Sequence, residues 1–295
     1  MAVKRIFIMG SGLMGAGIGQ VCAQAEMEVT LADISQAVLD KAVEGISWSV
    51  GKFLEKGKIE GDLDEIMGRI STATSVEGAA SADLVMEAVF EDLKVKQEAF
   101  EKLAPVLQDH TLVATNTSAI PITELAGGIS RPERFLGLHF FNPVPLMPAV
   151  EVIRGMATSD EAFQAGRRFI LDVGKEPILV HRDVAGFVIN RINFPSTMEA
   201  MRLVEEGVTS VEDVDKGLRL AAGRRMGIFE TGDMVGLDVT YGAMMAMYEE
   251  TGDPRWYPPL LLRRKVKAGH LGRKTGKGWY EYGPDGERLG PARNT

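Results

Sequence analysis

Two kinds of hydrophobic pattern divide the chain. In the first half, short apolar runs of strand type at 3–9 and 28–32 alternate with stretches such as 35–56, in which apolar residues recur at three- and four-residue steps. This alternation of strands and helices predicts a parallel, doubly wound α/β sheet. Further strands are expected at 69–73, 82–89, 111–115, 134–141, 149–154 and 177–181. Between 82–89 and 111–115, a helix is expected to bury Val95, Phe100, Leu103 and Val106 on one face.

The pattern changes near Gly186. From Phe187 onward no strand–helix alternation remains, and long amphipathic patterns follow at 188–204, 211–220, 237–248 and 259–268. They predict an all-α second domain. We therefore expect one domain over residues 1–185 and another over residues 186–295.

The glycines after the first strand indicate a nucleotide site. This G-x-G-x-x-G turn reads Gly10-Ser11-Gly12-Leu13-Met14-Gly15. Gly10 permits the tight turn, Gly12 lets the backbone approach a pyrophosphate, and Gly15 lets the following helix pack against the sheet. Asp33 ends the second strand, where a carboxylate accepts from the ribose 2′-hydroxyl of NAD and repels the 2′-phosphate of NADP. The pattern predicts a Rossmann domain that binds NAD; the alternative is a structural turn with a solvated Asp33.

The bulk composition argues against several classes of protein. The chain has 295 residues and a formal net charge of −8, which argues against general nucleic-acid binding. No apolar run approaches the roughly 18 residues of a membrane span, and the start does not resemble a signal peptide. The one cysteine, Cys22, cannot form an internal disulfide, so we expect a cytoplasmic protein. No Cys/His cluster or H-E-x-x-H motif suggests a metal.

One histidine has a pattern that suits acid–base chemistry. His139 lies near the end of an expected strand, and Glu151 lies on the next strand, beyond a proline-rich connector. Two neighbouring antiparallel strands would bring them together. A carboxylate on one imidazole nitrogen fixes the tautomer and raises the basicity of the other. By spacing alone, a general base and a structural histidine both remain open.

Other polar residues also have two interpretations. Ser118 follows a strand at the cofactor edge, where it would either cap the next helix or bond a substrate oxygen. Lys52, Lys56 and Lys58 end the long helix 35–56 in an otherwise acidic chain. They form either a solvated face or a positive arm for a phosphate-bearing substrate.

Taken in order, these motifs resemble the short-chain L-3-hydroxyacyl-CoA dehydrogenases, including bacterial 3-hydroxybutyryl-CoA dehydrogenases. The resemblance runs along nearly the whole chain. Beside the glycine turn, the matching segments are EAVFEDLKVK at 87–96, TNTS at 115–118, LHFFNPVP at 138–145, VEVI at 150–153, GFVINR at 186–191, GLD at 236–238 and KTGKGWY at 274–280.

The resemblance implies an NAD-dependent oxidation of an L-3-hydroxyacyl-CoA and a helical second domain that dimerises. It implies that His139 is the general base with Glu151 as its partner, and that Ser118 and Asn190 hold the substrate. Ser49 and Lys56 fall where the family contacts coenzyme A. The resemblance further implies that the nicotinamide half of NAD is surrounded by Glu91, Lys96, Ser118, Asn142 and Lys274.

Two departures from the family pattern leave the substrate open. Pro148 and Ala149 stand where the family usually has Lys-Leu, and Arg224 and Arg225 stand where it has an aromatic residue or histidine and a proline. These arginines are either surface or dimer-interface charge, or a site for a second carboxylate on the acyl chain, as in 3-hydroxyadipyl-CoA. Two further alternatives are a dehydrogenase of a free hydroxy acid, of gulonate or carnitine type, and a non-catalytic NAD-binding protein of crystallin type.

Overall fold

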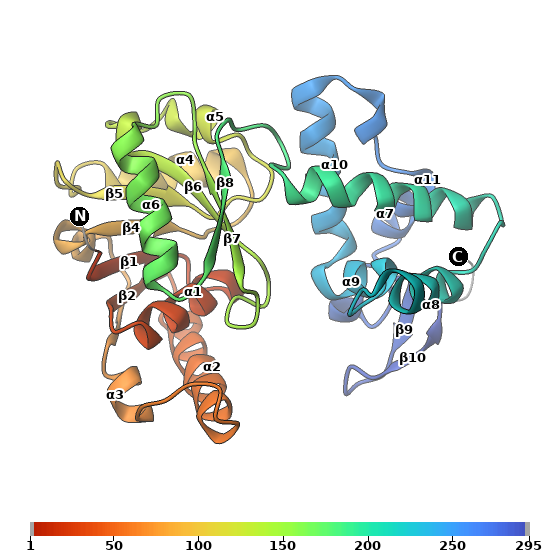
Figure 1. Cartoon of the computed structure of the whole chain (residues 1–295), viewed down its shortest axis with the longest axis horizontal. Helices are drawn as coiled ribbons and strands as arrows, with labels where there is room; N and C mark the ends of the chain where they lie inside the picture. Colours follow the sequence, from red (N-terminus) through yellow and green to blue (C-terminus); the bar gives the residue numbers. More distant parts are fainter. Residues whose placement is uncertain (1–2, 293–295) are drawn as a thin grey trace. The chain divides into compact units, whose positions relative to one another are not determined.

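The computed structural model of this chain describes residues 3–292 (Figure 1). It forms two compact units, of which the first ends at Phe187 and the second begins at Val188. The first is red to green in Figure 1 and the second is teal to blue. Each unit is described by itself below.

The first unit is built on one eight-stranded sheet with the strand order β3-β2-β1-β4-β5-β6-β7-β8. Every neighbouring pair is parallel except β6 and β7, which are antiparallel. The predicted doubly wound, mostly parallel sheet is therefore confirmed. The strands are β1 (Arg5–Met9), β2 (Glu28–Ala32), β3 (Ile70–Ala73), β4 (Leu84–Glu87), β5 (Leu112–Thr115), β6 (Phe135–Phe140), β7 (Ala149–Ile153) and β8 (Glu176–Val180).

Helices cover both faces of this sheet. Ile18 of α1, Leu39 of α2 and Phe163 of α6 join one core cluster with the strands, and Figure 1 shows α6 in front of the sheet. Behind the sheet, Phe100 of α4 packs edge-on against Phe135, with ring centroids 5.2 Å apart. The helices of this unit are α1 (Leu13–Gln24), α2 (Gln36–Glu55), α3 (Leu63–Met67), η1 (Glu77–Ser81), α4 (Leu93–Leu103), α5 (Ile122–Ala126), η2 (Pro132–Arg134) and α6 (Asp160–Asp172).

The structure corrects the expected face of α4. Val95 is 38% exposed and Val106 lies beyond the end of the helix, whereas Lys96 is buried. The hydrophobic pattern was wrong here because a lysine with ionic partners inside the protein can replace an apolar residue on the buried side.

The second unit is helical, as predicted, but it ends in a small hairpin that the pattern did not predict. Strands β9 and β10 pair antiparallel. A helix between Gly227 and Gly236 was also not predicted, because it is short. The elements are α7 (Ile189–Glu205), α8 (Val211–Ala222), α9 (Ile228–Val235), α10 (Leu237–Thr251), η3 (Pro254–Trp256), α11 (Leu260–Lys267), η4 (Arg273–Thr275), β9 (Tyr280–Tyr282) and β10 (Arg288–Pro291).

A buried carboxylate fixes this hairpin to the helices. Asp233 of α9, 1% exposed, accepts from the amides of Trp279 and Tyr280 at 2.8 and 2.9 Å and from the Tyr282 hydroxyl at 3.0 Å. Burial raises the pKa of Asp233, although these hydrogen bonds work to lower it. A similar carboxylate, Asp215 of α8, accepts from the Tyr280 hydroxyl at 2.8 Å. The hairpin is thus held by polar contacts that an apolar pattern cannot reveal.

We expect Asp233→Asn to lower the free energy of unfolding by about 2 kcal/mol. The amide keeps the shape of the carboxylate but turns an NH2 group toward donors, so at least one buried N–H or O–H loses its acceptor. Urea denaturation measures the effect. Glu249→Gln, at an exposed position of α10, is the matched control and should change stability by less than about 0.5 kcal/mol. Equal stability of both variants would contradict this role of Asp233.

Candidate functional site

The predicted cofactor and catalytic residues of the first unit gather at one edge of its sheet. Gly10 follows β1, Asp33 follows β2, Glu91 follows β4 and Ser118 follows β5. His139 lies near the end of β6, which is parallel to β5. In an open α/β sheet, ligands bind beyond these carboxyl ends.

The glycine turn has the backbone that its sequence predicts. Gly10 has φ +98°, which favours glycine. A Cβ on Gly15 would lie 1.8 Å from the Gly10 carbonyl oxygen, so a side chain is excluded there. A Cβ on Gly12, which caps α1, would meet nothing within 4 Å. The space at Gly12 and the free amides at the start of α1 fit a pyrophosphate.

Asp33 is linked directly to this turn. One carboxylate oxygen accepts from both the amide and the hydroxyl of Ser11, each at 3.0 Å. Ser11 is buried, so its two hydrogen bonds hold the Asp33 carboxylate in a fixed orientation. The second oxygen of Asp33 lies 3.4 Å from the Ser35 amide.

Lys96 is a buried lysine between two glutamates. Its Nζ lies 2.8 Å from Glu87 and 3.1 Å from Glu91, and Lys96 and Glu87 are 1% and 0% exposed. Glu87 also accepts from the Val89 amide at 2.7 Å and the Thr115 hydroxyl at 2.6 Å. This arrangement ties β4, β5 and α4 together beneath the edge of the sheet.

Glu91 collects several donors from the turn after β5. Its Oε1 accepts from the Thr117 hydroxyl at 2.6 Å, the Ser118 amide at 2.7 Å and the Ser118 hydroxyl at 3.2 Å. Burial works to raise the pKa of Glu91, but the charge of Lys96 and the bonds from Thr117 and Ser118 outweigh it, so the pKa is lowered. Glu91 is therefore ionised at neutral pH. The alternative of Ser118 as a helix cap is wrong, because the cap of α5 is Pro121.

His139 and Glu151 form a direct pair. They face each other across the antiparallel strands β6 and β7, and His139 Nδ1 lies 2.7 Å from Glu151 Oε2. The histidine is 6% exposed and the glutamate is fully buried. The His139 ring packs against Phe141, with centroids 4.6 Å apart. A carboxylate on Nδ1 leaves Nε2 as the basic nitrogen.

A pocket of about 1230 Å³ opens at this edge, between α1, α2 and the loop after β6, and Ser11, Gly12 and Leu13 of the glycine turn form part of its lining. Its apolar wall includes Val144 and Pro145 of that loop. Gln20 of α1 also lines it; the side chain is 2% exposed, and its Nε2 has no hydrogen-bond partner among residues 3–292. The other polar groups that line the pocket are Ser11, Lys41, Ser49, Lys52, Lys56, Lys58 and Asn142.

The loop in this pocket wall is fixed by a buried lysine. Lys175 Nζ donates to the carbonyls of Val144 and Met147, both at 2.7 Å. Burial lowers the pKa of Lys175. The buried ammonium binds two carbonyls of the loop between β6 and β7, so it fixes the loop that forms this wall of the pocket.

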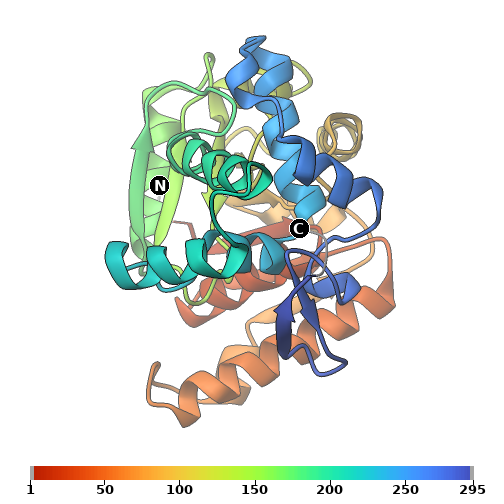
Figure 2. The same cartoon turned by 90° about the vertical axis from the view of Figure 1, so that its right-hand side faces the viewer.

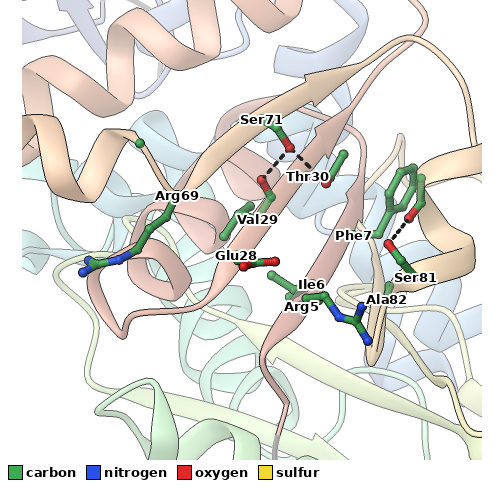
Figure 3. A pocket seen from close by; sticks show the side chains of 12 residues that line it. Arg5, Ile6, Phe7, Glu28, Val29, Thr30, Arg69, Ser71, Ser81 and Ala82 are labelled. Carbon is green, nitrogen blue, oxygen red and sulfur yellow. Dashed lines mark hydrogen bonds between the residues drawn. The ribbon is translucent and has the colours of Figure 1, made fainter.

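A second cavity, of about 270 Å³, lies at the opposite ends of β1 and β2 (Figure 3). Figure 3 shows Ser71 bonded to Thr30 and to the Val29 carbonyl. Its two arginines are engaged elsewhere, Arg5 with Asp83 and Arg69 with Glu65. None of the predicted site residues lines this cavity.

Three sets of predicted residues belong to the second unit. Asn190 lies in the first turn of α7. Lys274 Nζ is 2.7 Å from Asp238 of α10. Arg224 and Arg225 follow the C-terminal cap of α8, and among the described residues neither guanidinium forms an ion pair.

Sequence reasoning assigned no individual role to four supporting residues: Gln20, Glu87, Thr117 and Lys175. Glu87 and Thr117 lie in the matching segments 87–96 and 115–118, and a glutamate at the end of the buried strand β4 requires a buried partner. Gln20 and Lys175 gave no signal, since Gln20 lines a pocket and Lys175 is held by backbone carbonyls.

Within residues 3–292, no three His, Cys, Asp or Glu side chains come together as a metal site requires. The same residues contain no helix that is both long and apolar enough to cross a bilayer.

Comparison with known proteins identifies both parts of the chain. The family model of the 3-hydroxyacyl-CoA dehydrogenase NAD binding domain matches residues 5–184, and that of the 3-hydroxyacyl-CoA dehydrogenase C-terminal domain matches residues 186–282. A probable 3-hydroxybutyryl-CoA dehydrogenase of Deinococcus radiodurans is 41% identical over 275 residues, which cover 93% of this chain and 99% of the relative.

Two solved structures have the same fold over almost the whole length. FadB2 of M. tuberculosis superposes with a TM-score of 0.92 at 38% identity, covering 96% of this chain and 100% of that one. The (S)-3-hydroxybutyryl-CoA dehydrogenase PaaH1 of Ralstonia eutropha gives 0.90 at 38% identity, with coverage of 96% and 100%. The chain therefore belongs to the 3-hydroxyacyl-CoA dehydrogenase family of NAD-dependent oxidoreductases.

Proposed function

We propose that this chain oxidises L-3-hydroxyacyl-CoA thioesters and reduces the 3-oxo products, with His139 as general base. The observation that carries this proposal is the 2.7 Å contact between His139 Nδ1 and the buried Glu151 at the ligand-binding edge of the sheet. Curated relatives named 3-hydroxybutyryl-CoA dehydrogenase support the same class of substrate.

The acid–base step follows from this pair. Glu151 holds the Nδ1 proton, so Nε2 takes the proton of the substrate 3-hydroxyl during oxidation. Glu151 then stabilises the imidazolium that forms. In the reverse direction the imidazolium returns the proton to the 3-oxo oxygen. Ser118 and Asn190 are proposed to hold the substrate oxygens, which supplies the proximity contribution.

The glycine turn and the residues around Glu91 are proposed to hold NAD. When bound, NAD accepts or supplies the hydride at nicotinamide C4. The amides after Gly12 bind the pyrophosphate, Asp33 accepts from the adenosine ribose, and the ionised Glu91 accepts from the nicotinamide ribose. Lys96 is proposed to support the cofactor site through Glu91, because its ammonium is buried against Glu87 and Glu91. Asn142 and Lys274 complete the proposed cofactor set.

The pocket beside α2 is proposed to take the coenzyme A part of the substrate. Its lysines suit phosphates, and its apolar wall and the unpaired amide of Gln20 suit the neutral pantetheine arm. Ser49 and Lys56 line this pocket. This arrangement favours a phosphate-binding role for Lys52, Lys56 and Lys58 over a merely solvated face.

We propose a cytoplasmic homodimer that associates through the second unit. Ile192, Val208 and Leu220 of that unit are 67%, 65% and 80% exposed. Association of two copies through this unit would remove such apolar surface from water. Cys22 is buried, and burial raises the pKa of its thiol, so it suits a reducing compartment without being reactive.

We expect His139→Ala and Glu151→Gln each to lower kcat by about 10²- to 10⁴-fold, because general base catalysis contributes that much. Affinity for NADH, measured by fluorescence titration, should stay nearly the same. His110→Ala, an exposed histidine outside the site, is the control and should leave kcat unchanged. An equal loss of NADH binding would mean that His139 has a structural role only.

We expect Asp33→Ala to raise the KM for NAD by about 10-fold, since a charged hydrogen bond to the ribose is lost. The same substitution should reduce the preference of the enzyme for NAD over NADP. Steady-state rates with both cofactors test this. Asp40→Ala, an exposed acid of α2, should change neither value. An unchanged ratio of the NAD and NADP rates in Asp33→Ala would contradict the assignment of Asp33.

The unpaired Arg224 and Arg225 favour a second candidate substrate, a 3-hydroxy dicarboxylyl-CoA. If either guanidinium binds a distal carboxylate, the wild type will prefer 3-hydroxyadipyl-CoA over 3-hydroxybutyryl-CoA. Arg224→Gln or Arg225→Gln will then reduce that preference about 10-fold. A clear preference of the wild type for the neutral short chain would exclude this substrate.

A further inference from the structure

Helix α2 has two distinct faces. Leu39, Ala42, Ile46 and Val50 are its buried residues. On another face, Lys41, Gly45, Trp48, Lys52 and Lys56 follow at three- and four-residue steps, and all of them line the large pocket. The helix is 20 residues long and is orange in Figure 1 and Figure 2. It contributes two aromatic rings to the pocket lining, Trp48 among the lysines and Phe53 one position after Lys52.

Trp48 is unusual among the tryptophans of this chain. It is 70% exposed, whereas Trp256 and Trp279 are 3% and 0% exposed. An indole ring gains about 1.5–3 kcal/mol or more from burial, so an exposed one at a pocket is a candidate contact for a ligand. Side chains in a helix lean toward positions i−3 and i−4, and position i−3 here is Gly45. A Cβ at Gly45 would meet nothing within 4 Å, so the space beside this turn of α2 is open.

The cations around Trp48 define the chemistry of that ligand. Lys41, Lys52, Lys56 and Lys58 line the same pocket, in a chain whose net charge is −8. Only Lys52 forms an ion pair among the described residues, with Glu55 at 2.6 Å. Lys58 lies 5.6 Å from the ring centroid of Phe53. Several lysines beside an exposed, flat indole ring suit a base that carries phosphates.

We propose that Trp48 stacks on the adenine of the coenzyme A thioester and makes the enzyme select substrates that carry the nucleotide. This inference rests on the proposed function, since it assigns a residue within the proposed coenzyme A pocket. The lysines bind the phosphates of the 3′-phosphoadenosine diphosphate. Stacking on an aromatic ring changes binding of a base by about 5- to 150-fold, enough to influence KM.

Tryptophan fluorescence tests the contact without any turnover. Because Trp256 and Trp279 are buried, Trp48 is the tryptophan that a base in solution can reach. Coenzyme A and adenosine 3′,5′-bisphosphate should quench the wild-type emission, and pantetheine, which lacks the base, should not. Trp48→Leu should abolish the quenching. Equal quenching by pantetheine, or quenching that persists in Trp48→Leu, would overturn the proposal.

Kinetics test the selectivity. We compare acetoacetyl-CoA with acetoacetyl-N-acetylcysteamine, a thioester without the nucleotide. The ratio of kcat/KM for the two should fall about 10-fold in Trp48→Leu and less in Trp48→Phe, which keeps a ring. Leu171→Ala removes an exposed apolar side chain outside the pocket and should leave the ratio unchanged. An unchanged ratio in Trp48→Leu would overturn the proposal.

The two hypotheses fail in different ways. If the wild type turns over neither acetoacetyl-CoA nor 3-hydroxyadipyl-CoA, the proposed function is wrong, and quenching by adenosine 3′,5′-bisphosphate still decides whether Trp48 binds a base. If turnover is normal but neither quenching nor the kcat/KM ratio depends on Trp48, the stacking alone is wrong.

Discussion

The antiparallel pairing of β6 with β7 is the constraint on which the candidate site depends. It is the one reversed pair in an otherwise parallel sheet among the described residues, and its register sets His139 opposite Glu151. A shift of one residue would turn every β7 side chain to the other face of the sheet. Val150 and Val152 are fully buried in the core, so such a shift is strongly disfavoured. The hydrophobic core therefore fixes the geometry of the polar pair.

The loop between these strands links the pair to the pocket. A plain hairpin would join β6 and β7 in a few residues, but here the chain makes a detour from Phe141 to Pro148. Lys175 holds the carbonyls of Val144 and Met147, and the loop forms part of the pocket wall. The connection that brings His139 and Glu151 together thus also shapes the proposed place for the coenzyme A arm.

Local patterns were sufficient to predict most of this architecture. The strands, the glycine turn and the His139–Glu151 pair follow from short apolar runs and from residue types at strand ends, which depend on near neighbours. The buried Lys96, the terminal hairpin and the role of Asp233 were not predictable in this way. Each depends on a buried polar group whose partners lie on another element, and sequence spacing does not specify those partners.

Glu91 shows why the buried charges matter for function. In its proposed role Glu91 accepts from a ribose, and a carboxylate in that role has to be ionised and correctly placed before the ligand arrives. The two glutamates share one ammonium, from Lys96, and Glu87 is fully buried. Removing one member of a buried ion pair typically costs about 3–5 kcal/mol, so Glu87 keeps Lys96 in place. The charge of Lys96 in turn helps to lower the pKa of Glu91. Glu91 also accepts from the Ser118 amide and hydroxyl, so this one carboxylate links a proposed cofactor contact to a proposed substrate contact.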